Sequence, residues 1–262
     1  MTTAGPAGRA QGAPLEDTIE EAERVADAAK SIGVGVKLLG GAGVHLHSPS
    51  SHHPPLRRKY GDLDYVISSK DRKSALAFFP SLGYEANERF NLMQGDRRLY
   101  FYDGNNGKQV DVFIDVIRMS HVIDLRSRLG HMGPCASPSD LLLSKLQIYE
   151  VNKKDLVDVT ALVLDHHVKS DDDEGIDATY IARLAAEDWG LYRTLQINIG
   201  KLRHSLDELD VDRSTVGERL DEVWDAVEAQ PKGMKWKMRA QVGDRMRWYE
   251  LPEEVRSPYQ PE

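Results

Sequence analysis

Residues 62–68 are Asp-Leu-Asp-Tyr-Val-Ile-Ser, and every second residue from Leu63 to Ile67 is large and apolar. This alternation predicts a β-strand with one face buried in a core. Asp62 and Asp64 then point to the opposite face, about 6–7 Å apart along the strand. Two carboxylates placed in this way can share a divalent ion. The segment therefore predicts both a sheet and a metal site on it.

A second acidic strand is expected at Gln109–Ile117, which contains VDVFIDVI. Asp111 and Asp115 share one predicted face, but roughly 13 Å separates them along the strand, too far for one small metal cluster. We expect Asp111 to be the third carboxylate beside Asp62 and Asp64. Asp115 is then an outer carboxylate or a structural partner.

Three carboxylates that converge from separate segments repel one another unless cations neutralise them. Hard oxygen ligands suit Mg²⁺ or Mn²⁺. Two such ions about 3.5–4 Å apart can activate an attacking oxygen and stabilise a leaving oxygen, as phosphoryl and nucleotidyl transfer require. An isolated D-x-D pair is common by chance, so the neighbouring motifs decide how it is interpreted.

Gly40 and Gly41 end a predicted strand and begin a predicted short helix about 20 residues before the acidic pair. Glycines there let the backbone approach a ligand, and a helix N-terminus attracts phosphate. Arg58 lies between the two motifs and could bind a phosphate through two parallel hydrogen bonds from its guanidinium group. The alternatives are an ordinary strand–helix turn and a solvated basic loop.

Lys145 lies inside the apolar stripe of the predicted helix SDLLLSKLQIYE. A lysine there must extend to water or find an anion. Asp155 and Asp158, which share a face of the next helix, offer one structural answer: an ion pair that joins the two helices. The functional alternative is that Lys145 contacts a nucleotide phosphate, while one of these aspartates orients it or helps to bind substrate.

Composition limits the class of protein. The chain has 262 residues, a net charge of −8 and one cysteine. No apolar run is long enough to span a membrane, and the single cysteine fits a reducing cytoplasm. The negative net charge argues against a surface that is basic throughout and binds nucleic acid over its whole extent, but it is compatible with a local basic groove. One such region is the basic, aromatic stretch 232–250, which is typical either of nucleic-acid binding or of an amphipathic helix packed by its aromatics.

The periodicity predicts an α+β fold, a mixed β-sheet with flanking helices on one face, followed by a helical C-terminal region. The Pro- and Gly-rich residues 1–15 predict a disordered tail, the last dozen residues a loose tail, and the acidic run 171–174 a solvated loop. Further strands are expected at Val34–Leu39, Tyr84–Met93 and Arg97–Tyr102. Helices are expected at 16–31, 42–47, 70–82, 139–150, 153–168, 177–187, 189–209 and 213–229.

The ordered motifs resemble those of the AbiEii-type toxin nucleotidyltransferases, a branch of the DNA polymerase beta-like superfamily. The motifs are GG, R-x-x-x-D-x-D, V-D-V-F and L-x-x-K-L followed by K-D-x-x-D, and they lie within residues 34–166. The serine that follows the first glycine in many relatives is missing here. The residues that match the metal and phosphate motifs are Gly40, Gly41, Asp62, Asp64 and Asp111, and those that match the later motif are Lys145 and Asp155 or Asp158.

The resemblance implies a nucleotidyltransferase core at residues 16–130 and a helical C-terminal domain at residues 131–262. It implies Mg²⁺-dependent transfer of a nucleoside monophosphate from an NTP to RNA, a protein or a small molecule, and the toxin branch adds an antitoxin as a partner. The alternative is a non-catalytic module that keeps the fold and binds a nucleotide or a partner protein without turnover.

Overall fold

A five-stranded mixed sheet forms the centre of the N-terminal half in the computed structural model, which describes residues 12–170 and 174–251. The strand order is β1-β2-β5-β4-β3; β2 and β5 run parallel, and every other neighbouring pair is antiparallel. Two small two-stranded sheets accompany it. The strands are β1 (Lys37–Leu38), β2 (Leu63–Ile67), β3 (Glu85–Ala86), β4 (Arg98–Asp103), β5 (Lys108–Ile114), β6 (Val116–Arg118), β7 (Val122–Asp124), β8 (Val168–Lys169) and β9 (Ile176–Asp177).

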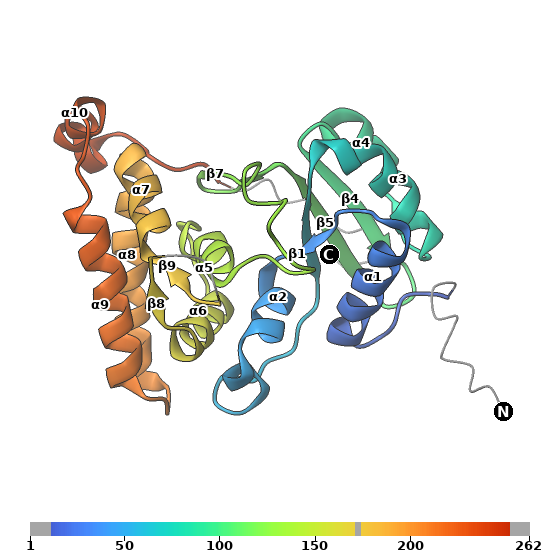
Figure 1. Cartoon of the computed structure of the whole chain (residues 1–262), viewed down its shortest axis with the longest axis horizontal. Coiled ribbons are helices and arrows are strands. Elements are labelled where there is room, and N and C mark those ends of the chain that lie inside the picture. Colours follow the sequence, from blue (N-terminus) through green and yellow to red (C-terminus); the bar gives the residue numbers. More distant parts are fainter. Residues whose placement is uncertain (1–11, 171–173, 252–262) are drawn as a thin grey trace.

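Helices flank this sheet and make up most of the C-terminal half, which lies beside the sheet in Figure 1. The predicted α+β class and its helical C-terminal region are therefore confirmed, and the helices predicted between 139 and 229 are present with their ends shifted by a few residues. The helices are α1 (Thr18–Ile32), α2 (Gly40–His47), α3 (Arg72–Ser81), α4 (Glu88–Gln94), α5 (Pro138–Leu146), α6 (Lys153–Asp165), α7 (Ala178–Glu187), α8 (Trp189–Ser205), α9 (Arg213–Ala229) and α10 (Met234–Val242).

One face of the sheet is buried under α1 and α3, as the alternation in β2 predicts. Leu63, Tyr65 and Ile67 are at most 1% exposed and belong to the same apolar cluster as both helices. The rings of Tyr65 and Phe79, from β2 and α3, lie 5.7 Å apart. The acidic positions of β2 and β5 consequently face the other side of the sheet, towards α2 and the C-terminal helices.

That second face is also partly covered, so the expectation of helices on one face alone is wrong. Val66 and Phe113, which point to this side, share an apolar cluster with Val44 of α2 and Leu141 of α5. Apolar side chains on both faces of β2 and β5 require cover on both sides. What remains between these apolar patches is the acidic region that forms the candidate site.

The strand predicted at Tyr84–Met93 is wrong beyond its first residues. The chain forms β3 and then turns into α4, because the Asn87 side chain accepts a hydrogen bond from the Phe90 backbone N–H at 3.0 Å and caps the helix. Leu92 and Met93, whose apolar character favours a strand in the sequence, are 87% and 67% exposed on this helix.

The strand predicted at Gln109–Ile117 ends early, at Ile114. Asp115 has a φ of 61°, in the left-handed region that non-glycine residues rarely adopt. This residue turns the chain out of the sheet and into the β6–β7 hairpin, where the Leu125 N–H donates to the Asp115 carbonyl oxygen at 2.9 Å. Asp115 therefore does not continue the face that Asp111 begins, contrary to the prediction.

The predicted tails and the acidic loop lie mainly outside the described residues. Residues 1–11 of the N-terminal tail, residues 171–173 of the loop and residues 252–262 at the C-terminus are among these. Within the described part, Pro14 is buried and its carbonyl oxygen accepts a hydrogen bond from Asn106 at 3.0 Å. In the same part of the chain, no helix combines the length and apolar character needed to cross a bilayer.

The basic, aromatic stretch 232–250 includes α10, and its aromatic rings are used in packing. The Trp236 indole donates to the Ala185 carbonyl oxygen at 2.9 Å, and the rings of Tyr249 and Tyr149 stack with centroids 3.7 Å apart. These contacts favour the packed-helix alternative over stacking on nucleic-acid bases.

A buried ion pair within α1 generates a prediction about stability. The Arg24 Nη2 and Glu21 Oε1 atoms lie 2.6 Å apart, and these residues are 9% and 1% exposed. Replacing Arg24 by Leu leaves a carboxylate buried without its cation, so we expect unfolding free energy to fall by about 3–5 kcal/mol. Urea denaturation measures this loss. Lys30→Leu, at an exposed position of the same helix, is the control, and equal losses in the two variants would contradict the argument.

Candidate active site

Asp64 and Asp111 are direct neighbours on the sheet face opposite α1 and α3. They are Cα partners in the parallel register of β2 and β5, and adjacent strands lie about 4.8 Å apart. Asp62 precedes β2, is exposed, and accepts a hydrogen bond from the Gln109 N–H at 3.3 Å. The structure thus brings Asp64 and Asp111 together as predicted and leaves Asp62 at the solvent edge of the pair.

The closeness of these two acids shows in the electrostatics of Asp64. Burial, and then the negative charge of Asp111, raise the pKa of Asp64 to about 7, against the opposing effect of Lys145. Burial also raises the pKa of Asp111, although hydrogen bonds and charge from Arg98 oppose that shift. A carboxylate whose pKa is raised by a neighbouring carboxylate gains stability from any cation that reaches both.

Asp111 forms an ion pair with Arg98. The Arg98 Nε donates to Asp111 Oδ1 at 2.6 Å, and its Nη2 donates to Asp111 Oδ2. The Arg98 side chain also lies over the Phe113 ring, 5.0 Å from the centroid. Across residues 12–170 and 174–251, no three His, Cys, Asp or Glu side chains are grouped closely enough to hold a metal ion. The three-carboxylate metal site therefore stays a prediction.

Because Gly40 has no side chain, the backbone at the start of α2 can lie directly against Asp64. Gly40 has a φ of 62°, and a Cβ built on it would lie 2.0 Å from Asp64 Oδ2. The Leu39 N–H also donates to the Asp64 carbonyl oxygen at 2.7 Å. At Gly41 a Cβ would lie 2.1 Å from Arg58 Nη2. Gly40 therefore leaves no room for a side chain beside Asp64, whereas at Gly41 the obstacle is the flexible end of Arg58. Both contacts lie within the protein, so phosphate binding at this turn stays a prediction.

The predicted phosphate-binding cations, Arg58 and Lys145, are both held by aspartates of α6. Arg58 forms two hydrogen bonds to Asp158, at 2.7 and 2.6 Å. Lys145 Nζ lies 2.7 Å from Asp155 Oδ1 and 3.0 Å from Asp158 Oδ2. Burial lowers the pKa of Lys145, but Asp158 and Asp155, helped by Asp64, outweigh it and raise the pKa to about 12. The structural alternative, an ion pair joining two helices, is present in the structure.

Asp115 lies apart from the Asp64–Asp111 pair, as its distance along the chain suggests. Its carboxylate accepts from the Ser69 N–H at 2.9 Å and lies 3.8 Å from the Arg126 Nε. These contacts place it as a structural partner of the turn that it forms, one of the two roles expected for it.

Arg98 is the site residue that the sequence interpretation missed. The signal was present in Arg-Leu-Tyr-Phe-Tyr-Asp at 98–103, where Leu99 and Phe101 fill the buried face. By the period of two, Arg98 and Tyr100 must then point to the same side as the acids. Which acid they meet depends on the register of β4 against β5, in which Tyr100 is paired with Asp111.

By chemical type, though not by their present spacing, the carboxylates of this face suit a hard divalent cation. Asp64 and Asp111 offer four carboxylate oxygens from adjacent strands, Asp62 adds two more at the edge, and oxygen ligands are what Mg²⁺ and Mn²⁺ prefer. Burial, together with the charges of Asp111 and Asp62, raises the pKa of Asp64 by more than Lys145 and Arg98 lower it. A cation at Asp111 would share the two oxygens of that carboxylate with Arg98.

Comparisons with known proteins give only distant likenesses. No family model matches the chain, and no curated protein matches it either. A lincomycin-bound lincosamide antibiotic adenylyltransferase, LnuA, superposes with a TM-score of 0.41 and 18% identity, over 56% of this chain and 96% of that one. An antigenic nucleotidyltransferase-like protein from Paracoccidioides brasiliensis superposes with a TM-score of 0.41 and 15% identity, over 85% and 97% of the two chains. Superpositions this loose carry no argument about function, which has to rest on the site.

The raised pKa of Asp64 predicts how stability depends on pH. The folded state holds the Asp64 proton up to a pKa of about 7, whereas the unfolded chain releases it near the ordinary aspartate pKa of 3.8. The contribution of Asp64 to stability is therefore largest at low pH and is lost as pH rises through this window. Without divalent ions, we expect Asp64→Asn to be more stable than the parent at pH 8 by roughly 1–4 kcal/mol, a difference that disappears near pH 4.

Urea unfolding in EDTA at the two pH values measures this difference, and Asp96→Asn, at an exposed position, is the control. Added Mg²⁺ should stabilise the parent protein more than Asp64→Asn. A variant less stable than the parent at pH 8 would show that Asp64 is not under electrostatic strain.

Gly40 gives a second prediction. In Gly40→Ala, the left-handed φ and the collision with Asp64 act together, so we expect a loss of roughly 1–3 kcal/mol in unfolding free energy. Gly217→Ala is the matched control, because a Cβ there meets nothing within 4 Å and alanine favours the helix interior by about 0.5–1 kcal/mol. Urea melts of the two variants should shift in opposite directions, and a neutral Gly40→Ala would remove the close-approach argument.

Proposed function

We propose that this protein is a nucleotidyltransferase that uses Mg²⁺ or Mn²⁺ to move a nucleoside monophosphate from an NTP to an acceptor. The observation that carries the proposal is the pairing of Asp64 with Asp111 on one sheet face, with the Gly40 backbone pressed against Asp64. Two adjacent carboxylates repel each other and so destabilise the fold. Catalysis with divalent ions gives a reason for placing them side by side.

In this proposal each side of the acid pair has its own task. The backbone N–H groups at the start of α2, beside Gly40 and Gly41, attract the phosphates of the nucleotide. Lys145 and Arg58 lie on the same side and add positive charge. A divalent ion held by the three carboxylates would neutralise phosphate charge and activate the attacking oxygen.

The aspartates of α6 set the position of those two cations. Asp158 accepts hydrogen bonds from Arg58 and lies within ion-pair distance of Lys145, so one carboxylate orients both. Its neighbour Asp155 holds the Lys145 Nζ from a second side. This arrangement combines the two alternatives for Lys145, since a lysine fixed by aspartates can also face the phosphates.

The second candidate is a non-catalytic module that binds a nucleotide or a partner protein. The observation that favours it is the pair of hydrogen bonds from Arg98 to Asp111, which satisfies that carboxylate without any metal ion. A protein that binds but does not turn over NTP could keep this pair permanently. Turnover separates the two candidates, because binding alone is common to both.

The test is transfer of label from each α-³²P NTP, in Mg²⁺, to total bacterial RNA, to the protein itself or to small molecules. We expect transfer by the parent protein and a loss of about a hundredfold or more in Asp62→Ala/Asp64→Ala, because divalent-ion catalysis requires the oxygen ligands. The control is Asp221→Ala/Asp225→Ala, which removes two exposed carboxylates from α9. The acceptor that takes the label also tests the toxin-like role and its expected RNA acceptor.

Two outcomes would contradict the proposal. Label transfer that survives in Asp62→Ala/Asp64→Ala would mean that the metal site lies elsewhere. NTP binding without transfer to any acceptor class would favour the binding module instead.

A further inference from the structure

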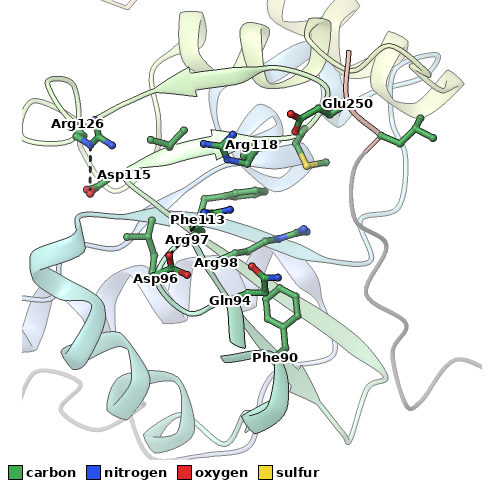
Figure 2. Close-up of a pocket in the computed structure, with 14 residues that line it drawn as sticks. Phe90, Gln94, Asp96, Arg97, Arg98, Phe113, Asp115, Arg118, Arg126 and Glu250 are labelled. Atoms are coloured by element: carbon green, nitrogen blue, oxygen red, sulfur yellow. Dashed lines mark ion pairs between the residues drawn. The ribbon is translucent and has the colours of Figure 1, made fainter. Parts of the chain in front are cut away.

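A cavity lies on the acid-bearing face of the sheet, on the far side of Asp111 from Gly40. Its volume is about 460 Å³, and it is walled by α4, by β4 to β6 and by the segment that ends the described chain (Figure 2). Ligand sites of small molecules typically span roughly 300–1,000 Å³. The volume is thus suited to one sugar-phosphate unit rather than to a large macromolecular surface.

Four arginines line this cavity in a protein whose net charge is −8. They outnumber the three carboxylates of the same wall, and they come from separate strands and loops that meet only in the fold. Arginines spread over a surface would serve solubility equally well. A cluster of arginines around one cavity is typical of phosphate recognition. The arginines are Arg97, Arg98, Arg118 and Arg126, and the carboxylates are Asp96, Asp115 and Glu250.

These arginines differ in how firmly they are held. Arg97 forms an exposed pair with Asp96 at 3.6 Å, and Arg126 forms an exposed pair with Asp124 at 2.8 Å and lies 3.8 Å from Asp115. Exposed pairs contribute little and are easily exchanged. Within residues 12–170 and 174–251, the exposed Arg118 side chain forms no ion pair or hydrogen bond. The cavity therefore has guanidinium groups that are available to an incoming anion.

Arg98 connects the cavity to the candidate active site. It lines the cavity, rests on the Phe113 ring at the cavity floor, and donates to both oxygens of Asp111. An anion bound beside Arg98 competes for the same guanidinium and weakens its hold on Asp111. Binding in the cavity and exposure of the Asp111 carboxylate are thus linked through one side chain.

We propose that this arginine-lined cavity binds the phosphate group of the acceptor substrate and so presents an acceptor hydroxyl to the Asp64–Asp111 pair. This inference rests on the proposed nucleotidyl transfer and names its acceptor class: a sugar phosphate, either free or as the terminal nucleotide of an RNA. The donor NTP and the acceptor then occupy opposite sides of the acid pair.

The reaction balances without any further reactant. The acceptor hydroxyl oxygen attacks the α-phosphorus of the NTP and forms a new phosphate ester bond. The bond from the α-phosphorus to the oxygen that bridges to the β-phosphorus breaks, and pyrophosphate leaves with that electron pair. The hydroxyl proton is released to water.

The test is a binding measurement on the full chain, with its donor site first saturated by Mg²⁺ and the α,β-methylene analogue of each NTP in turn. The two probes are ribose 5-phosphate and the ribonucleotide trimer UpUpU, and ribose without phosphate is the ligand control. We expect at least one probe to bind, and its affinity to fall about tenfold or more in Arg118→Glu, since a charge-assisted contact is lost and reversed. Arg118→Lys should keep most of the affinity.

Arg183→Glu is the matched charge reversal, because Arg183 is exposed on α7 and does not line the cavity. A similar loss of affinity in Arg183→Glu and Arg118→Glu would mean that net charge, not the cavity, attracts the probes, and would overturn the proposal. The identity of the probe that binds distinguishes a free sugar phosphate from an RNA end.

The remaining outcomes separate this inference from the proposed function. If the NTP analogue binds but neither phosphate probe does, or if Arg118→Glu leaves probe affinity unchanged, the acceptor cavity is wrong and nucleotidyl transfer still stands. If no NTP analogue binds to the parent protein, the proposed function fails, and the acceptor assignment fails with it.

Discussion

Electrostatic repulsion between Asp64 and Asp111 is the constraint around which the rest of this structure is arranged. The two residues are register partners on adjacent parallel strands, so the sheet itself holds them close together. Burial strengthens the repulsion, because charges interact more strongly away from water. The surrounding cations can be understood as responses to this pair. Arg98 satisfies Asp111 from one side, and Lys145 offsets the charge of Asp64 from the other.

The two cations reach the acids from different halves of the chain. Arg98 comes from β4 of the sheet, whereas Lys145 comes from α5 of the helical region and is itself held by Asp155 and Asp158. Asp158 also binds Arg58, which lies in the loop before β2. A continuous set of ion pairs therefore joins the helical region to the loop beside the glycine turn. The C-terminal helices are in this sense part of the site and not only a cover over one face of the sheet.

The sequence predicted those features that depend on short-range periodicity. The alternation in residues 62–68 placed Leu63 and Ile67 in a core and Asp64 on the opposite face, because strand side chains alternate with a period of two. It could not predict that Arg98 reaches Asp111, since that contact depends on the pairing of β4 with β5. Nor could it predict the end of β5 at Asp115, where an unusual φ overrides a strongly strand-like segment. The glycine turn was identified from the sequence, but the close approach of Gly40 to Asp64 depends on the tertiary fold.

The same geometry explains why both functional interpretations remain physically coherent and how they differ. With Arg98 on Asp111, the site is electrostatically satisfied and has one carboxylate, Asp64, that holds its proton unusually tightly. With Arg98 drawn away by an anion, the acid pair regains its full repulsion and its affinity for a divalent cation rises. Anion binding in the arginine-lined cavity and cation binding at the carboxylates then favour each other, because each relieves a charge that the other exposes. A transferase gains from this coupling, since donor and acceptor would complete the site only together, whereas a simple binding module has no use for it.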